Sequence, residues 1–333
     1  MRISGLRTNF HTDAGVVKAV DGVDLTVNQG EILAVVGESG CGKTVMARSI
    51  LRLVPHPGRI AAGEIWLDGQ DLLKLSDRQM KTVRGNAITM VFQEPMASLN
   101  PVFTVGNQIT EMLTAHRPEM SRADRDRRVI ELMAAVGIAS PEQRVGSYPH
   151  QLSGGMRQRV MIAMALACGG TRLLIADEPT TALDVTIQAQ ILELFQQLQR
   201  SIGMSVMLIT HDLGVVAEIA NRVAVMYAGS IVESTDVDSL FERPGHPYTM
   251  GLLRSLPQRR NGTRKAPLYT IPGSVPNLLE LQPGCKFLSR CPHAREEICG
   301  GEEPPLEEVS AGHWVRCRRV GQIRIEPNLE APR

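Results

Sequence analysis

The loop Gly37-Glu38-Ser39-Gly40-Cys41-Gly42-Lys43-Thr44, directly after the apolar run 32–36, constrains the fold most. It fits the pattern of Gly, four residues, Gly-Lys and Ser or Thr. Its glycines let successive backbone N–H groups form an anion nest, while Lys43 can bridge outer phosphates and the Thr44 hydroxyl can ligate magnesium. A helix expected at 45–53 would point its partial positive charge at the same phosphates. The sequence therefore predicts a strand, loop and helix that bind a nucleoside triphosphate.

A second apolar run, 173–176, ends in Asp177 and Glu178. A buried parallel strand presents such side chains at its carboxyl end. Asp177 is predicted to hold magnesium through water, and Glu178 to orient or deprotonate the water that attacks a phosphate. An exposed acidic pair at a strand end is the plainer interpretation of these two residues alone. The phosphate loop makes that interpretation much less favoured.

Two further apolar runs end in a polar residue: 205–210 is followed by His211, and 88–92 by Gln93. A histidine in this place senses a phosphate or is an ordinary structural residue, and the residues alone leave both interpretations open. Several strands are therefore predicted to converge on one phosphate site.

The stretch Leu152-Ser153-Gly154-Gly155-Met156 lies between the phosphate loop and the Asp-Glu pair. A turn of small residues that opens a helix offers N–H donors to a phosphate, as a second anion site. One chain cannot easily place both anion sites on one ATP. Taken alone, the stretch is an ordinary Ser-Gly-Gly helix cap.

Together these residues resemble the nucleotide-binding subunit of an ABC transporter over almost the whole chain. The resemblance assigns six motifs: Walker A at 37–44, Gln93 as the Q-loop residue near magnesium, the signature at 152–156, Walker B at Asp177 and Glu178, the D-loop at 181–184 with Asp184 at the nucleotide, and His211 as the switch. It also implies that two such subunits close head to tail, with ATP between one subunit's phosphate loop and the other's Ser153, Gly154 and Gly155. An aromatic residue near the end of the first strand is expected to meet adenine. Phe10 is the candidate, and a core role is its alternative.

Length and composition agree with this interpretation. With 333 residues, 43% of them hydrophobic, the chain can bury a large core and form more than one domain. A net charge of +1 argues against a nucleic-acid surface. The N-terminus lacks an apolar signal region, and the longest apolar run, 160–168, is about half of the roughly twenty residues that span a membrane. A soluble chain is expected, whose membrane role requires partner proteins.

The expected fold class is α/β: a P-loop ABC-type nucleotide-binding domain at 1–242, with antiparallel β and helical subdomains, followed by a small cysteine-containing C-terminal extension at 243–333. The helical subdomain is expected at about 94–160, where Val129, Leu132, Met133 and Val136 have helical spacing and Gly137 can end the helix. Residues 187–198 carry an apolar stripe typical of a buried helix face, and 223–233 is typical of a hairpin.

Four of the six cysteines lie in the tail, at Cys285, Cys291, Cys299 and Cys317, separated by five, seven and seventeen residues. Disulfides are not expected in a protein that uses cytosolic ATP. Zinc usually takes cysteines two to four residues apart, and such pairs are missing here. Four thiolates also satisfy an iron–sulfur cluster. Zinc, a cluster and unliganded thiols all stay open at this point.

The phrases Gly284-Cys285-Lys286-Phe287 and Arg290-Cys291-Pro292 resemble the C-terminal extension of ATPase subunits from oligopeptide and dipeptide importers. The segment 271–276 fits the same extension. In that family the four cysteines are associated with a [4Fe–4S] cluster, so the resemblance implies one here, besides ATP and Mg²⁺. Cys41 and Cys168 lie outside the set.

The resemblance therefore implies an ATP-hydrolysing motor of a di- or oligopeptide importer, peripheral on the cytoplasmic face of the inner membrane. Its expected partners are two integral membrane permease subunits, a second ATPase subunit, identical or preferably different, and indirectly an extracytoplasmic solute-binding protein. Nickel and glutathione are alternative cargoes. A soluble ABC ATPase that acts on nucleic acid or ribosomes is much less favoured, because such proteins usually carry tandem domains or a long inserted arm.

Overall fold

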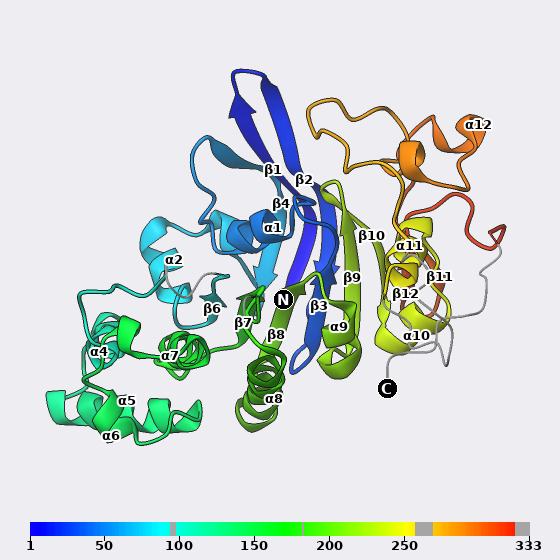
Figure 1. Ribbon diagram of the computed structural model, residues 1–333. Coiled ribbons are helices and arrows are strands. Elements are labelled where there is room, and N and C mark those ends of the chain that lie inside the picture. The colour runs from blue at the N-terminus through cyan, green and yellow to red at the C-terminus, as the bar shows by residue number, and fades with distance from the viewer. Residues whose placement is uncertain (94–97, 182, 257–268, 324–333) are drawn as a thin grey trace, which may run out of the picture. The chain divides into compact units, whose positions relative to one another are not determined.

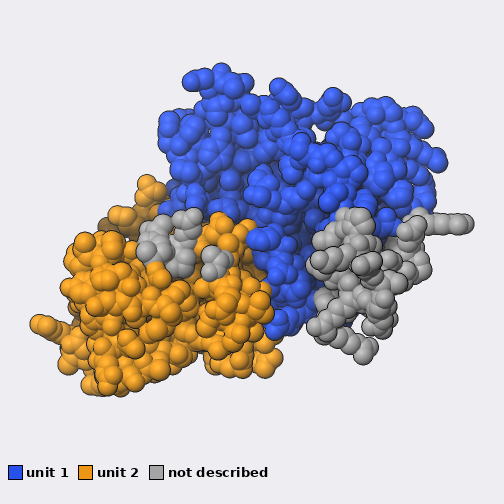
Figure 2. Space-filling view, in the orientation of Figure 1, with its two compact units in different colours: residues 1–26, 33–73, 210–333 blue, residues 27–32, 74–209 orange. Residues whose placement is uncertain are grey.

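A computed structural model of the chain describes residues 1–93, 98–181, 183–256 and 269–323. The chain forms two compact units (Figure 2). Unit 1 comprises Met1–Thr26, Leu33–Leu73 and Thr210–Arg333, and unit 2 comprises Val27–Ile32 and Lys74–Ile209. The phosphate loop and the four tail cysteines thus belong to the same unit.

The first sheet of unit 1 is antiparallel, with the strand order β2-β1-β4-β5. Figure 1 labels its strands β1, β2 and β4. Its strands are β1 (Arg2–Thr12), β2 (Gly15–Thr26), β4 (Gly58–Leu67) and β5 (Gln70–Asp71). The turn after β4 is made by Asp68 and Gly69, both with left-handed backbone. This sheet is the antiparallel β part that the sequence predicts.

The other strands of unit 1 follow the order β11-β12-β10-β9-β3. They are β3 (Ile32–Val36), β9 (Arg222–Tyr227), β10 (Ser230–Asp236), β11 (Glu307–Ser310) and β12 (His313–Val315). β3 runs parallel to β9, and β9 and β10 form the predicted hairpin, whose turn residues Ala228 and Gly229 have positive φ. The end of β3 delivers the chain into the phosphate loop.

Short helices complete unit 1: α1 (Lys43–Ile50), α9 (Leu213–Ile219), α10 (Val237–Glu242), α11 (Pro247–Arg254), η3 (Leu288–Arg290) and α12 (Glu296–Cys299). One apolar core joins side chains of β3, β9 and β10 to Tyr248 and Phe287. Tail residues therefore bury their apolar groups against the strands of the same unit that precede and flank the phosphate loop.

Helix α1 differs from the predicted range 45–53 at both ends. It begins two residues early because the left-handed Gly42 stands at its N-cap. It ends three residues early because Arg52 takes a left-handed conformation and the Leu53 N–H donates to the Arg48 carbonyl at 2.8 Å. That bond is a C-terminal helix closure, here made without glycine.

Unit 2 contains three parallel strands in the order β6-β7-β8 and, among the described residues, the longest helices. The strands are β6 (Ile88–Val91), β7 (Leu173–Asp177) and β8 (Ser205–Thr210). The helices are α2 (Asp77–Val83), α4 (Val105–His116), α5 (Arg122–Ala135), α6 (Pro141–Arg144), η2 (Pro149–Gln151), α7 (Gly154–Leu166) and α8 (Val185–Ile202); η1 (Leu72–Lys74) precedes them.

Helices α4, α5 and α7 pack on one another where the sequence predicts a helical subdomain. Residues 94–97 of that predicted range lie outside the described residues. The predicted end at 160 falls inside α7, because the apolar run from Val160 continues as buried helix to Leu166. In the part of the chain that the structure describes, no helix has both the length and the hydropathy needed to cross a bilayer.

Candidate functional site

The phosphate loop is closely packed against neighbouring backbone. Gly37 and Gly42 have φ of +153° and +107°. A Cβ on Gly37 would lie 2.1 Å from the Met226 carbonyl oxygen, and one on Gly42 would lie 2.2 Å from the Ala19 carbonyl oxygen. Glycine is therefore required at both positions for space as well as for conformation.

Lys43 is 5% exposed and folds back over its own loop. Its Nζ donates to the carbonyl oxygens of Gly37 at 2.7 Å and Glu38 at 3.0 Å. No side chain caps the N-terminus of α1, where an anion is favoured. The ammonium group thus stands at the loop with its position set by main-chain acceptors.

Cys41 is fully buried in the loop. Burial raises the pKa of its thiol, and the nearby Lys43 opposes this only in part. The thiol therefore stays protonated near neutral pH and is a poor nucleophile.

The structure brings two predicted catalytic residues of unit 2 together. Gln93 follows β6 and Glu178 follows β7, and these strands are paired in parallel. Gln93 Nε2 donates to Glu178 Oε2 at 2.9 Å, and Thr181 Oγ1 donates to the same oxygen at 3.0 Å. The hydroxyl contact of Thr181 is a feature that the sequence pattern did not reveal.

The backbone around this pair is unusual as well. Glu178 has a φ of +47°, a left-handed conformation that costs a non-glycine residue about 1–3 kcal/mol. Its N–H is held by the Ile209 carbonyl of β8 at 2.9 Å. Asp177, the residue before it, is only 2% exposed at the end of β7. Such strain is concentrated at functional sites, because the surrounding structure must maintain it.

The signature residues have structural roles of their own in unit 2. Ser153 caps α7, with its Oγ accepting the Met156 N–H at 3.3 Å. A Cβ on Gly155 would lie 2.5 Å from Cγ2 of Ile187, so α7 and α8 approach closely there. Gly154 has more room, because the nearest atom to its added Cβ, on Leu183, is at 3.4 Å. The helix-cap interpretation is thus confirmed, and the role toward a second subunit's ATP stays a prediction.

Asp184 likewise caps α8, with its Oδ1 accepting the Ile187 N–H at 2.9 Å. Ala182 of the predicted D-loop lies outside the described residues. His211 is exposed after β8, and the next residue, Asp212, caps α9. The nucleotide roles of Asp184 and His211 stay predictions.

Phe10 lies near the end of β1, as predicted, opposite Val17 and Gly58. Its half-buried ring packs on Gly58, where an added Cβ would come within 2.7 Å of the ring. This contact explains the position of the Phe10 ring within its sheet. Contact of the ring with adenine stays a prediction.

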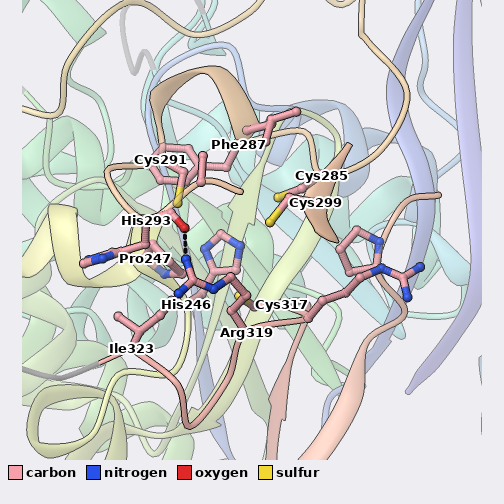
Figure 3. Close-up of a pocket in the computed structure, with 14 residues that line it drawn as sticks. His246, Pro247, Cys285, Phe287, Cys291, His293, Cys299, Cys317, Arg319 and Ile323 are labelled. Carbon is pink, nitrogen blue, oxygen red and sulfur yellow. Dashed lines mark hydrogen bonds between the residues drawn. The ribbon is translucent and has the colours of Figure 1, made fainter. Parts of the chain in front are cut away.

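One pocket of unit 1 gathers the four tail cysteines (Figure 3). Its lining also includes His246 and Phe287, together with Arg319, whose guanidinium donates to the His293 carbonyl. Burial raises the pKa of Cys285 to about 12 and that of Cys291 to about 11. Without a metal these groups are therefore neutral thiols at physiological pH.

The backbone draws two segments of this pocket together. The Cys285 N–H donates to the Cys299 carbonyl at 2.8 Å. Among the described residues, however, no group of three or more His, Cys, Asp or Glu side chains could hold a metal ion as they stand. The four predicted cysteines line one pocket but do not form a metal site as they stand, so the [4Fe–4S] cluster stays a prediction.

Burial also lowers the pKa of His246 to about 4, so its ring is neutral. Its Nδ1 accepts the Tyr248 N–H at 3.1 Å, which places the ring proton on Nε2. His246 was not among the predicted site residues, because a single histidine at a helix start carries no distinguishing pattern.

Two family models match successive parts of the chain. Residues 20–181 match the ABC transporter family, and residues 232–299 match the oligopeptide/dipeptide transporter C-terminal region. The second match includes Cys285, Cys291 and Cys299 and ends before Cys317.

Similar proteins extend over nearly the full length. A probable peptide ABC transporter ATP-binding protein of Sinorhizobium fredii is 53% identical over 96% of this chain and 95% of its own length. An oligopeptide transport ATP-binding protein of Bacillus subtilis is 50% identical over 95% of this chain and 87% of its own.

Among solved structures, the dimeric ATP-binding cassette MJ0796, bound to ADP and Pi, is similar with a TM-score of 0.64 and 27% identity. The match covers 71% of this chain and 98% of that one. The predicted nucleotide-binding fold, with its mixed sheets and helices, is confirmed by this likeness. The chain therefore belongs to the ABC transporter family, as an ATP-hydrolysing subunit of the branch that carries the oligopeptide/dipeptide transporter C-terminal region.

Proposed function

We propose that this chain drives the import of di- or oligopeptides by hydrolysing ATP on the cytoplasmic face of the inner membrane, docked on two permease subunits. The observation that carries this proposal is the full-length similarity to peptide and oligopeptide transport ATP-binding proteins. Nickel and glutathione remain alternative cargoes, because the motor does not need to contact the cargo.

Transport in proteoliposomes tests the cargo. The chain would be assembled with the permease and solute-binding protein encoded beside it, and uptake of labelled dipeptides, longer peptides, glutathione and Ni²⁺ would be compared. ATP-dependent peptide uptake is expected. Uptake of Ni²⁺ or glutathione without any peptide uptake would overturn the peptide assignment.

For the reaction, we propose that ATP is bound by the phosphate loop and that Thr44, Gln93 and Asp177 hold Mg²⁺, directly or through water. The buried carboxylate of Asp177 and a hydroxyl at the start of α1 are suitable oxygen ligands for this ion. Bound Mg²⁺ supplies positive charge that offsets the charge of the phosphate oxygens. Lys43 contributes a second positive charge at the same loop.

Glu178 is proposed to take the proton of the attacking water as its oxygen bonds to the γ-phosphorus. The bond from phosphorus to the β–γ bridging oxygen breaks, ADP keeps the electron pair, and the proton passes on to the released phosphate. Gln93 and Thr181 both donate to Oε2 of Glu178, and these two bonds fix the orientation of the carboxylate. A single hydrogen-bonded carboxylate is suited to this role of general base.

Glu178→Gln is expected to keep ATP binding and to lower the hydrolysis rate by a factor of about 10²–10⁴, the usual contribution of a general base. Equilibrium ATP binding and phosphate release would be measured on the same preparation. Glu193→Gln, an exposed carboxylate on α8, is the matched control and is expected to hydrolyse ATP normally. Hydrolysis by Glu178→Gln at the wild-type rate would remove Glu178 from this role.

Two ATPase subunits are proposed to close head to tail, with Ser153, Gly154 and Gly155 of each serving the ATP of the other. Support comes from MJ0796, which was solved as a dimer with ADP and Pi. We favour a different ATPase as the second subunit. Purification of the assembled transporter and identification of its ATPase chains would decide between two copies and two different chains.

For the tail, we propose a [4Fe–4S] cluster on Cys285, Cys291, Cys299 and Cys317. The support is that four unpaired thiols line one pocket, and that a bound metal would favour the thiolate forms that burial disfavours. Iron, sulfide and visible absorbance would be measured on anaerobically purified protein. Cys291→Ser is expected to lose the iron and Cys168→Ser to keep it; zinc without iron would refute the cluster.

A further inference from the structure

Glu38, the second residue of the phosphate loop, brings a negative charge to a site for a polyanion. Like charges at close range disfavour binding by an amount that depends on how well they are neutralised. In this chain the neutralising group comes from the tail, in the segment that runs from Cys285 to Cys291, here called the Cys285–Cys291 segment.

Arg290 of this segment forms a two-pronged ion pair with Glu38. Nη1 lies 2.7 Å from Oε2, and Nη2 lies 2.9 Å from Oε1. The Arg290 side chain is 4% exposed, whereas that of Glu38 is 29% exposed. A bidentate pair of this kind fixes the orientation of the carboxylate as well as offsetting its charge.

The guanidinium of Arg290 is also held from its other sides. Nε donates to the Pro272 carbonyl at 2.9 Å, and Nη1 donates to the Tyr227 hydroxyl at 3.4 Å. Phe287 packs edge-on against Tyr227, with ring centroids 5.2 Å apart. Arg290 is thus preorganised for Glu38, so little side-chain entropy is lost in forming the pair.

The main chain of Glu38 connects this ion pair to the phosphate-binding atoms. Its N–H donates to the Tyr248 hydroxyl at 2.8 Å, and its carbonyl accepts from Lys43 Nζ at 3.0 Å. A shift of Glu38 would therefore displace an acceptor that sets the position of the Lys43 ammonium.

We propose that Arg290 is a positioning residue for ATP binding, which acts through Glu38 by neutralising its carboxylate and holding the phosphate loop in its binding shape. The proposal rests on the proposed function in one respect, that this loop binds ATP. Arg290 itself need not touch the nucleotide.

The same segment supplies a matched control at its other end. Lys286 Nζ lies 3.1 Å from Asp21 Oδ2 and donates to Ser230 Oγ at 2.6 Å. The side chain of Lys286 is 7% exposed, so it anchors the segment much as Arg290 does. Neither of these partners lies in the phosphate loop. Loss of Lys286 therefore weakens the segment without uncovering a charge at the loop.

The test is equilibrium binding of a fluorescent ATP analogue, with Mg²⁺, to the full chain. Arg290→Met is expected to raise the Kd about tenfold, which corresponds to the loss of one charge-assisted hydrogen bond. Adding Glu38→Gln to Arg290→Met is expected to restore most of the affinity, because the unpaired charge is then gone. Lys286→Met is expected to bind the analogue within about twofold of wild type.

Kinetics of the assembled transporter add a second readout. Arg290→Met is expected to raise KM for ATP while kcat at saturating ATP stays near wild type, because the ion pair serves binding rather than the chemical step. A wild-type Kd for Arg290→Met would overturn the proposal. So would a double variant that binds no better than Arg290→Met alone, since a purely structural role predicts no rescue.

Thermal unfolding without nucleotide verifies that each variant is folded. If Arg290→Met does not fold, Arg290→Lys is used with and without Glu38→Gln. Lysine keeps the positive charge but cannot make the two-pronged hydrogen bonds of the guanidinium. Arg290→Lys is then expected to give an intermediate Kd that Glu38→Gln improves, and no improvement would overturn the proposal. Failure of the wild-type chain to bind ATP would instead reject the proposed function.

Discussion

At the scale of single residues, the glycines of the phosphate loop are required both by their backbone conformation and by the atoms packed around them. Pattern and spacing indicate an anion nest, and the structure adds the carbonyl oxygens of Ala19 and Met226 that leave no room for a Cβ. The partnership of Glu38 with Arg290 could not be predicted, because 252 positions separate them and no periodicity links them. Only the folded chain brings the two charges together.

A loop glycine can be required because its φ is positive or because no space exists for a Cβ. Gly40 and Gly42 share the first condition and differ in the second. Both have positive φ, +80° and +107°, but an added Cβ meets nothing within 4 Å at Gly40 and lies 2.2 Å from the Ala19 carbonyl oxygen at Gly42. Gly40→Ala is expected to cost about 1 kcal/mol of unfolding free energy, from backbone strain. Gly42→Ala is expected to cost about 3 kcal/mol or more, since overpacking adds to the strain. Urea denaturation measures both, and equal costs would contradict the steric argument.

At the scale of elements, strong hydrophobic periodicity correctly predicted which segments form helices and strands. The predicted first and last residues of these elements were less accurate. The stripe at 187–198 is the buried face of α8, with Ile191, Leu194, Phe195 and Leu198 buried. Gly137 ends the α5 region with a φ of +76°, as predicted. The predicted end of α1 is wrong because Arg52, rather than a glycine, takes the left-handed conformation there. When the surrounding structure forces a left-handed conformation on a residue such as Arg52, no sequence pattern indicates it.

The cap of α10 carries a pH-dependent prediction. Asp236 Oδ1 accepts the Ser239 N–H at 2.8 Å. Burial alone would raise the pKa of Asp236, but hydrogen bonds from Ser239 and Thr235 outweigh it and lower the pKa below its ordinary value. The carboxylate therefore stabilises the fold fully above its unfolded pKa of about 3.9 and loses this effect as pH falls through the lower native value.

Asp236→Asn keeps a capping oxygen and cannot titrate. The stability advantage of wild type over this variant is expected to be largest near neutral pH and to shrink below about pH 4. Chemical denaturation of both proteins across this range measures the difference. A difference that is independent of pH would show that the charge of Asp236 does not contribute.

At the scale of the whole molecule, the sequence predicted a boundary near residue 243, and this domain division stays a prediction. The compact units follow contacts rather than chain order: residues after 243 join the phosphate loop in unit 1, while Gln93, Glu178 and the signature belong to unit 2 (Figure 2). Burial of Tyr248 and Phe287 in the core of unit 1 explains this grouping. Family motifs identify modules, but they do not specify which modules share a core.

The proposed head-to-tail dimer can be tested by substitution of Gly154. A Cβ added at this residue would lie 3.4 Å from Leu183, an ordinary van der Waals distance, so a side chain fits. Gly154→Asp places a carboxylate where the second subunit's γ-phosphate is proposed to lie. We expect it to leave ATP binding by the isolated chain unchanged and to lower hydrolysis by the assembled dimer at least a hundredfold, as for loss of an anion-stabilising donor. Gly154→Ala is the control and should retain most activity. Equal loss in both variants would point to damage within α7 instead.

The ion pair between Glu38 and Arg290 also has a consequence for biosynthesis. The phosphate loop leaves the ribosome long before Arg290 has been translated, by roughly 10–50 s at ordinary elongation rates. During this interval the carboxylate of Glu38 lacks its guanidinium partner, so a nascent or truncated chain should bind ATP more weakly than the finished one. Full nucleotide affinity is thus acquired only after Arg290 has been synthesised and the Cys285–Cys291 segment has packed against the phosphate loop.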